Sequence, residues 1–207
     1  MYTKDKVTLI NGDCMEYMAG LPDKWADVAI VDPPYLDAVF NKPDGHMRRV
    51  DIVGMSKWAD APKSEYFIEL SRVSCEQIIF GGNYFTEFLR PNNNWFIWYK
   101  NNDGTHLSMA EMAWVSIRKN TKVFELRPMG LKADFHPTSK PIKLYEWLLQ
   151  NYAKPGMRIL DTHLGSGSSA IAAHYYGCEF VGIEIDTDYY SAAVNRFENE
   201  TKQVALI

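Results

Sequence analysis

The sequence predicts a single-domain α/β protein with a doubly wound, mostly parallel sheet of seven strands that includes one antiparallel hairpin strand. Short apolar runs alternate with amphipathic segments, which is the pattern of strands and helices in such a sheet. The runs Trp95–Tyr99 and Ala113–Arg118 leave no room for a helix between them, so they predict an antiparallel hairpin. The chain has 207 residues, of which 46% are apolar and 23% charged, enough for one domain with a full core.

The predicted strands are short apolar runs that end at turn signals. They span Val7–Ile10, Asp27–Val31, Gln77–Phe80, Trp95–Tyr99, Ala113–Arg118, Arg158–Asp161 and Phe180–Glu184. The predicted helices carry apolar residues on one face or are rich in alanine. They span Glu65–Ser74, Lys140–Ala153, Ser168–Tyr176 and Thr187–Glu200. The stretches Leu36–Pro62 and Thr121–Ser139 lack a regular pattern and predict long loops, which are usually functional or disordered.

Composition predicts a cytoplasmic protein without a membrane span, signal peptide or metal site. No apolar run approaches the ~18–20 residues that cross a bilayer, and residues 1–6 lack an apolar stretch. Cys14, Cys75 and Cys178 are odd in number and widely spaced, as expected of reduced thiols. The five histidines show no metal-binding spacing.

The net charge of −4 argues mildly against a nucleic-acid partner, but the charges are unevenly distributed. Residues 100–143 carry eight cations and four anions. A basic middle segment is typical of a protein with one phosphate-facing side, although ordinary solvated charge would look the same.

Asp32-Pro33-Pro34-Tyr35 directly follows the predicted strand Asp27–Val31. Open α/β sheets bind ligands at the carboxyl ends of their strands. Two consecutive prolines have fixed φ and no N–H to donate, so the tetrad presents a rigid row of acceptors beside an aromatic ring. Such a row suits an amino group held by its hydrogens, with a flat base stacked on Tyr35. An ordinary Asp-Pro-Pro turn is the alternative.

The segment 158–169 predicts a strand, a glycine turn and a helix. Gly165 and Gly167 in the turn permit the backbone to approach a ligand closely. No Lys follows the glycines and the third glycine of the dinucleotide pattern is missing, so a pyrophosphate is disfavoured. Glu184 ends the next strand and follows Asp161 at close to the ~20-residue spacing that an acidic residue contacting the ribose hydroxyls has in nucleotide-binding βαβ units. With Asp13 and Asp161 it predicts an acidic cleft, which suits a cationic nucleoside without phosphate, such as S-adenosylmethionine. A glycine turn that merely packs a helix is the alternative.

Together these residues resemble the beta group of amino-methylating DNA methyltransferases, in which the catalytic motif precedes the cofactor motif. The resemblance covers nearly the whole chain and implies a Rossmann-like methyltransferase fold over residues 1–207. The implied catalytic residues are Asp32, Pro33, Pro34 and Tyr35. The implied residues that bind S-adenosylmethionine are Asp13, Cys14, Lys140, Asp161, Leu164, Gly165, Ser166, Gly167 and Glu184. The segment 136–141, His-Pro-Thr-Ser-Lys-Pro, resembles the motif near the methionine end of the cofactor.

The chain departs from the family pattern where Asp-Pro-Phe is usual and Asp161-Thr162-His163 stands instead. His163 could tune the site or simply fill it. The chain is also short for a family that often carries a discrete target-recognition domain.

The resemblance implies methyl transfer to the 6-amino group of adenine in DNA, after the base is flipped out of the duplex. Asp32 would accept one amino hydrogen and the Pro33 carbonyl the other, while Tyr35 stacks on the base. Aspartate at the first position resembles adenine-directed members more than cytosine-directed ones, so the 4-amino group of cytosine is the alternative. Two hypotheses from other functional classes remain. One is a methyltransferase-like DNA-binding subunit with little activity, and the other is a nucleotide-dependent oxidoreductase.

DNA is the predicted partner, and residues 36–62 and 100–139 are the expected DNA-facing elements. Candidate phosphate contacts are Arg48, Arg49, Lys57, Arg118, Lys119 and Lys122. Trp98, Tyr99 and Trp114 could stack on bases but are expected to pack the sheet, and Tyr84 could line the cleft or cap the core. A homodimer is a further hypothesis, because two copies of so short a chain would cover more DNA.

Overall fold

One nine-stranded sheet runs through the molecule, in the order β1-β2-β9-β8-β3-β4-β6-β5-β7. The computed structural model describes residues 1–35, 61–102, 108–127 and 139–202. The strands are β1 (Tyr2–Lys4), β2 (Val7–Asn11), β3 (Ala26–Val31), β4 (Ser74–Phe80), β5 (Trp95–Tyr99), β6 (Ala110–Val115), β7 (Lys122–Glu125), β8 (Arg158–Asp161) and β9 (Glu179–Glu184). The prediction of a mostly parallel α/β sheet is confirmed, but the predicted count of seven strands is too low.

Five neighbouring strands, β2, β9, β8, β3 and β4, are all parallel to one another. The predicted hairpin is also confirmed, because β5 and β6 pair antiparallel and β6 pairs antiparallel with β4. The two strands that the sequence did not predict are short edge strands. β1 has three residues, and β7 has four residues that alternate between half-buried and exposed, inside the segment predicted as the loop Thr121–Ser139. Neither is long enough to produce a clear periodic signal.

β6 begins and ends three residues earlier than predicted. The expected strand Ala113–Arg118 stops at Val115, because the next residue, Ser116, completes its pairing with Gln77 through its side chain. The Ser116 N–H still donates to Gln77 O at 2.9 Å. The Ser116 hydroxyl accepts a hydrogen bond from the Gln77 backbone N–H at 2.8 Å.

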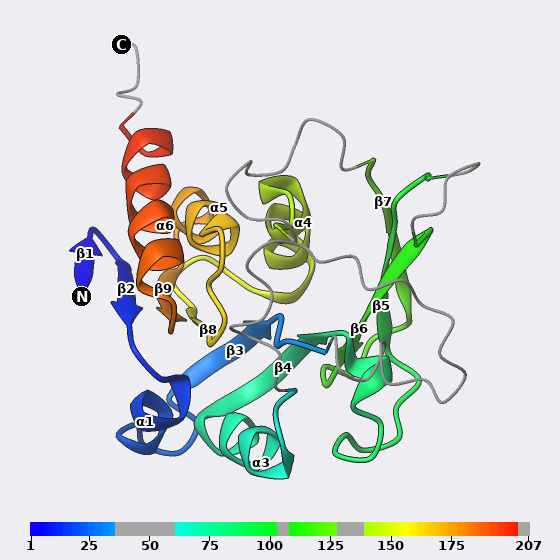
Figure 1. Ribbon diagram of the computed structural model, residues 1–207. Helices are drawn as coiled ribbons and strands as arrows, with labels where there is room; N and C mark the ends of the chain where they lie inside the picture. The colour runs from blue at the N-terminus through cyan, green and yellow to red at the C-terminus, as the bar shows by residue number, and fades with distance from the viewer. Residues whose placement is uncertain (36–60, 103–107, 128–138, 203–207) are drawn as a thin grey trace, which may run out of the picture.

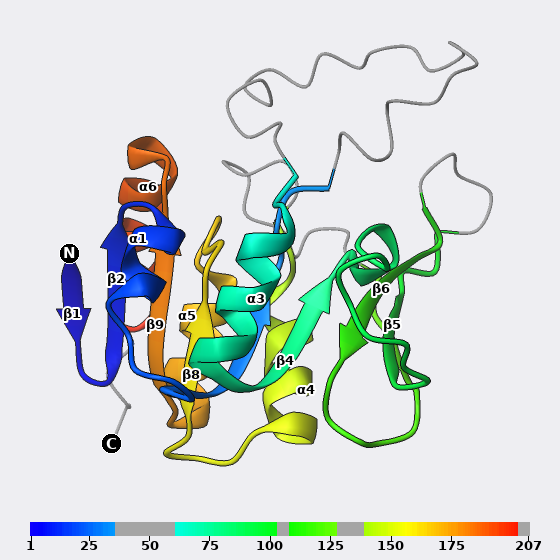
Figure 2. The ribbon, with the colours of Figure 1, turned by 90° about the horizontal axis from the view of Figure 1, so that it is seen from below.

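Helices cover both faces of the sheet (Figure 1). They are α1 (Cys14–Ala19), α3 (Ser64–Val73), α4 (Ile142–Tyr152), α5 (Ser168–Tyr176) and α6 (Thr187–Glu200), with a short 3₁₀ turn η2 (Gly82–Tyr84). In the view from below, α3 lies over the near face of the sheet and α4 lies behind it (Figure 2). The predicted α5 and α6 have the observed bounds, while α1, a six-residue helix capped by Asp13, was not predicted.

Each face of the sheet has its own apolar core, and β3 shows how one strand serves both. Val28 and Ile30 pack with α4 and α5, while Ala29 and Val31 pack with α1 and α3. This follows from the two-residue period of a strand, which sends successive side chains to opposite faces. Because β3 is buried on both sides, its position is firmly fixed, and so is the backbone that leaves its carboxyl end at Asp32.

Among the residues described, no helix is long and apolar enough to cross a membrane.

The Gly82 backbone offers a stringent test of the packing between η2 and β6. A Cβ at this position would lie 2.5 Å from Trp114 Cβ and 3.0 Å from Trp114 N, too close for backbone that cannot move independently. We expect Gly82→Ala to destabilise the protein by about 1–3 kcal/mol, the range for overpacking, measured by urea denaturation. Gly20→Ala is the matched control, because its nearest contact is an ordinary 3.5 Å. Equal stability of the two variants would contradict this packing.

Candidate active site at the carboxyl edge of the sheet

Four carboxylates stand at the carboxyl ends of four adjacent strands. Asp13 follows β2, Glu184 ends β9, Asp161 ends β8 and Asp32 follows β3, and these strands are neighbours in that order. Adjacent strands are ~4.8 Å apart, so the row spans roughly 14 Å. The sheet therefore brings together acids that are far apart in the chain and lines them up along one edge, as an extended cationic ligand would require.

Asp161 lies at the centre of this row and is almost completely buried. Its Oδ1 accepts a hydrogen bond from the His163 backbone N–H at 3.0 Å, and its Oδ2 accepts one from the Ser169 hydroxyl at 2.6 Å. Burial raises the pKa of Asp161 to about 7, although both hydrogen bonds act to lower it. A carboxyl group with this pKa changes charge near neutral pH, so a cationic ligand beside it would favour the ionised form.

The glycine turn after β8 is held against Glu184. Gly165 and Gly167 have φ values of 53° and 76°, in the left-handed region where glycine is favoured. The Gly165 N–H donates to Glu184 Oε2 at 2.8 Å, and the Asp186 N–H donates to Oε1 at 2.9 Å. These bonds fix the orientation of the carboxylate, which retains lone pairs for hydroxyl donors.

Asp13 and Cys14 occupy the start of α1. Asp13 Oδ1 accepts hydrogen bonds from Met15 N at 2.6 Å and Glu16 N at 3.2 Å, so Asp13 caps the helix. The Cys14 thiol is half-buried, and burial raises its pKa to about 11. It is therefore a neutral apolar contact in this site and not a thiolate.

Thr162 and His163, where the chain departs from the family pattern, both pack against α3. The Tyr66 hydroxyl lies 2.6 Å from Thr162 Oγ1, which lies 2.9 Å from His163 Nδ1. The Tyr66 and His163 rings meet edge to face at 5.4 Å. Burial lowers the pKa of His163 to about 4, so the imidazole is neutral at physiological pH. The two residues thus form a neutral hydrogen-bonded contact between the end of β8 and α3.

The tetrad leaves the end of β3 with its tyrosine in an aromatic stack. The Tyr35 and Tyr84 rings are parallel, with centroids 4.9 Å apart and an interplanar angle of 11°. Gly81, with φ 65°, lies so close to Tyr35 that a Cβ would be 2.5 Å from the ring. Tyr84, which could equally have capped the core, is therefore part of the same aromatic platform as Tyr35. Trp98 and Trp114 are buried in the core, as expected of residues that pack the sheet.

Lys140, which the family resemblance implies to be a cofactor contact, forms an ion pair with the first residue of the tetrad. Its side chain is 4% exposed, and its ammonium donates a hydrogen bond to Asp32 Oδ2. Glu111 Oε2 lies 3.4 Å from the same ammonium, and Glu111 Oε1 accepts a hydrogen bond from Lys100. Sequence reasoning missed Glu111 and Lys100, because the hairpin that carries them contains no motif. The only available signal was the pair of unlike charges, which become diagonal neighbours once Trp98 pairs with Glu111 across the hairpin.

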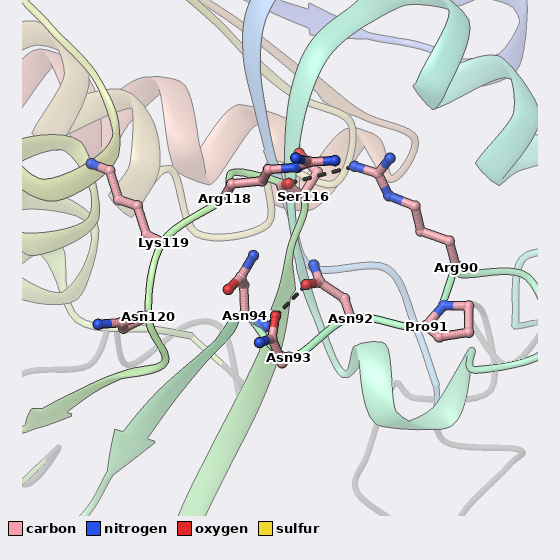
Figure 3. A pocket seen from close by; sticks show the side chains of 9 residues that line it. All are labelled: Arg90, Pro91, Asn92, Asn93, Asn94, Ser116, Arg118, Lys119 and Asn120. Atoms are coloured by element: carbon pink, nitrogen blue, oxygen red, sulfur yellow. Dashed lines mark hydrogen bonds between the residues drawn. The ribbon is translucent and has the colours of Figure 1, made fainter.

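The predicted phosphate contacts fall in two groups. Arg48, Arg49 and Lys57, together with most of the loop 36–62 and with residues 136–138 of the segment 136–141, lie outside the described residues. Arg118 and Lys119 line a polar pocket of about 410 Å³ with Arg90, Ser116 and four asparagines (Figure 3).

This pocket lies at the opposite end of β6 from the tetrad. Ala113 pairs with Phe80 at the carboxyl end of β4, and β6 runs antiparallel to β4, so β6 ends at Val115 on the way toward the opposite edge of the sheet. Arg118 follows three residues after that end. Lys119 and Lys122 both donate hydrogen bonds to Asn151, at 2.5 and 2.6 Å. The pocket is thus separate from the row of carboxylates.

Within the described part of the chain, no group of three or more histidine, cysteine or acidic side chains is arranged to hold a metal ion.

Two named methylases are similar to this chain over most of its length. M.HinfI, a type II methyltransferase of Haemophilus influenzae, is 25% identical over 248 residues, which cover 91% of this chain and 67% of the relative. A protein of Escherichia coli strain K12 named as the methylase YubD is 27% identical over 203 residues, covering 90% of this chain and 88% of the relative.

Solved structures show the same fold. The M1.HpyAVI–SAM complex superposes with a TM-score of 0.64 at 21% identity, covering 92% of this chain and 98% of that one. The PvuII DNA methyltransferase, described as cytosine-N4-specific, gives 0.65 at 14% identity, covering 95% and 88%. The family described as DNA methylase matches residues 90–195, more than half of the chain. The chain therefore belongs to the DNA methylase family.

Proposed function

We propose that this protein transfers a methyl group from S-adenosylmethionine to the 6-amino nitrogen of a flipped-out adenine in DNA. The single observation that carries the proposal is Asp32 Oδ1, a buried acceptor without a hydrogen-bond partner among the described residues, at the end of the carboxylate row. A buried carboxylate oxygen left unpaired is costly, so it is best explained by a donor that arrives with the substrate.

The residues of the row fit the proposed cofactor. Glu184 would accept hydrogen bonds from the ribose hydroxyls, and Asp161 would face the positive charge of the methionine portion. Gly165 and Gly167 allow the backbone to approach the ligand closely, and Asp13 and Cys14 would border the adenine. When bound, S-adenosylmethionine supplies an electrophilic methyl group on its sulfonium.

The tetrad would then orient the target amine. Asp32 Oδ1 would accept one amino hydrogen and the Pro33 carbonyl the other, which directs the nitrogen lone pair away from both acceptors. Tyr35, backed by Tyr84, would hold the plane of the base by stacking. Rate enhancement from such positioning needs no covalent intermediate with the protein, and the methylated amine releases its proton afterwards.

Adenine is favoured over cytosine because aspartate stands at the first position of the tetrad. The 4-amino group of cytosine is the second candidate, since a protein of the same fold is described as cytosine-N4-specific. Both amines present two hydrogens to the same two acceptors, so the discrimination would come from the shape of the base.

The proposed function is tested by incubating the protein with unmethylated plasmid DNA and S-adenosylmethionine, followed by nucleoside analysis of the product. We expect N6-methyladenine. N4-methylcytosine would support the second candidate, and cofactor binding without any methyl transfer would support a DNA-binding subunit.

Asp32→Ala is expected to lower the methyl-transfer rate by at least ~100-fold, because it removes the proposed acceptor of the amino group. Affinity for S-adenosylhomocysteine, measured by calorimetry, should change little, because Asp32 stands at the substrate end of the row. Transfer at the wild-type rate by this variant would contradict the mechanism.

Cofactor binding should depend on pH through Asp161. Its pKa of about 7 means that below this pH the carboxyl must lose a proton before it can face a cation. We expect the affinity for S-adenosylmethionine to fall by up to tenfold per pH unit below that pKa and to level off above it. Asp161→Asn should bind weakly with a flat profile. A wild-type affinity that is constant from pH 5.5 to 8 would contradict this role.

The pocket around Arg90 and Arg118 is our candidate for DNA phosphate contacts away from the tetrad. Its nine lining residues include three cations and no acid. The double variant Arg90→Gln with Arg118→Gln should reduce the slope of log affinity against log salt by about 2, one for each phosphate that is no longer neutralised. Lys202→Gln, an exposed lysine beyond α6, is the matched control. An unchanged slope in the double variant would remove these residues from the interface.

A further inference from the structure

Four charged side chains of alternating sign form a chain that begins at Asp32. Lys140 lies between Asp32 and Glu111, and Lys100 binds the far oxygen of Glu111. They come from four places in the fold: the end of β3, the segment before α4, β6 and the residue after β5. Both ammonium groups also lie over aromatic rings, Lys140 at 4.6 Å from the centroid of Phe80 and Lys100 at 4.8 Å from that of Trp98.

The two carboxylates in this chain differ in how their oxygens are engaged. Glu111 Oε2 is buried and pairs with the Lys140 ammonium at 3.4 Å, whereas Asp32 Oδ1 is buried and accepts no hydrogen bond within the described structure. Lys140 donates a hydrogen bond to Asp32 Oδ2, and Oδ1 therefore faces away from the lysine. The orientation of Asp32 is therefore set by Lys140, and the position of Lys140 is set in turn by Glu111.

A lysine shared between two carboxylates neutralises each only in part. Burial raises the pKa of Asp32, Lys140 lowers it, Glu111 raises it again and the more distant Lys100 lowers it. Burial alone would lower the pKa of Lys140, but Asp32 and Glu111 together raise it well above its ordinary value, so the ammonium stays charged. Glu111 and Lys100 thus act on Asp32 with opposite sign.

We propose that Glu111 and Lys100 are positioning residues of the methyl-transfer site. Glu111 shares the Lys140 ammonium with Asp32, and Lys100 offsets the charge of Glu111. The two residues therefore set in opposite directions how strongly the lysine neutralises Asp32 through Oδ2, while Oδ1 stays open for the amino group of the base. This inference rests on the proposed function for its catalytic meaning. The arrangement depends on the hairpin, because Glu111 pairs with Trp98 in the β5–β6 ladder and the Lys100 N–H donates to Met109 O at 2.8 Å.

Other titratable groups face Asp32 from the surrounding elements. They are Asp161 at the end of β8 and the phenols of Tyr35, Tyr66 on α3 and Tyr145 on α4. Burial raises the pKa of each phenol above its ordinary value, so all three stay neutral. Of these four groups, only Asp161 can change charge near neutral pH. Asp161 is present in wild type, Glu111→Gln and Lys100→Gln alike, so it does not distinguish them.

The test measures the titration of Asp32 directly. Carbon NMR of protein labelled at the aspartate carboxyl groups would be recorded against pH for wild type, Glu111→Gln and Lys100→Gln, with the Asp32 signal assigned from Asp32→Asn. Glu111→Gln should lower the pKa of Asp32 and Lys100→Gln should raise it, each by about one pH unit, the lower end for a nearby charge. Lys143→Gln, an exposed lysine in the first turn of α4, should leave it unchanged.

Opposite shifts cannot arise from a general loss of packing, which would move both variants in the same direction. Shifts of the same sign, or none, would overturn the proposal. If Glu111→Gln does not fold, Lys100→Gln alone decides: the proposal is overturned when the pKa of Asp32 fails to rise in that variant.

Single-turnover methyl transfer to DNA gives the catalytic counterpart. Because Asp32 acts as the carboxylate, the rate falls as pH drops through its pKa. The acid limb should move to lower pH in Glu111→Gln and to higher pH in Lys100→Gln, with cofactor affinity within about twofold of wild type. A wild-type protein that binds cofactor but methylates no DNA would refute the proposed function, while the NMR titration would still decide whether Glu111 and Lys100 control Asp32.

Discussion

The contact on which the site depends is the ion pair between Lys140 and Asp32. A carboxyl group at the bottom of an active site tends to become protonated, because burial disfavours its charged form. A protonated Asp32 would lose the acceptor that an amino group needs. Lys140 opposes this protonation and at the same time occupies one carboxylate oxygen, so that the other is left facing away from it. One interaction thereby acts on both the charge and the orientation of the carboxylate that we propose as the acceptor of the amino group.

The sheet explains why these groups meet at all. Parallel strands end at one edge, and the order β2-β9-β8-β3 places the residues that would hold a nucleoside beside the residue that would hold a base. Asp32 and Asp161 are far apart in the chain but end neighbouring strands. β3 is buried on both faces, so the position of the tetrad is determined by the packing of the whole domain rather than by a flexible loop.

Much of the fold could be predicted because its signals are local. The helices 168–176 and 187–200 have the predicted bounds, since a glycine or a capping residue marks their ends. β1 and β7 escaped prediction because they are edge strands whose side chains are half-buried or exposed, and α1 because its six residues are too few to show a helical period.

The residues of the candidate site also differ in how far the sequence alone predicts them. Asp32, Asp161 and Glu184 stand at strand ends that the sequence marks clearly. The partners of Lys140 could not be predicted, because Glu111 comes close to it only through the register of the β5–β6 hairpin. The family resemblance suggested a cofactor contact for Lys140, but pairing across a sheet is not visible in a single sequence.

The central claim is that Asp32 accepts the amino group through Oδ1 while Lys140 holds Oδ2. The most direct measurement is a crystal structure of the protein with an adenine-containing DNA and S-adenosylhomocysteine. We predict a flipped adenine whose amino nitrogen lies within hydrogen-bonding distance, ~2.7–3.2 Å, of Asp32 Oδ1, with the Lys140 ammonium still on Oδ2. A flipped base that contacts Asp32 only after Lys140 has left it, or that does not contact Asp32, would contradict this claim.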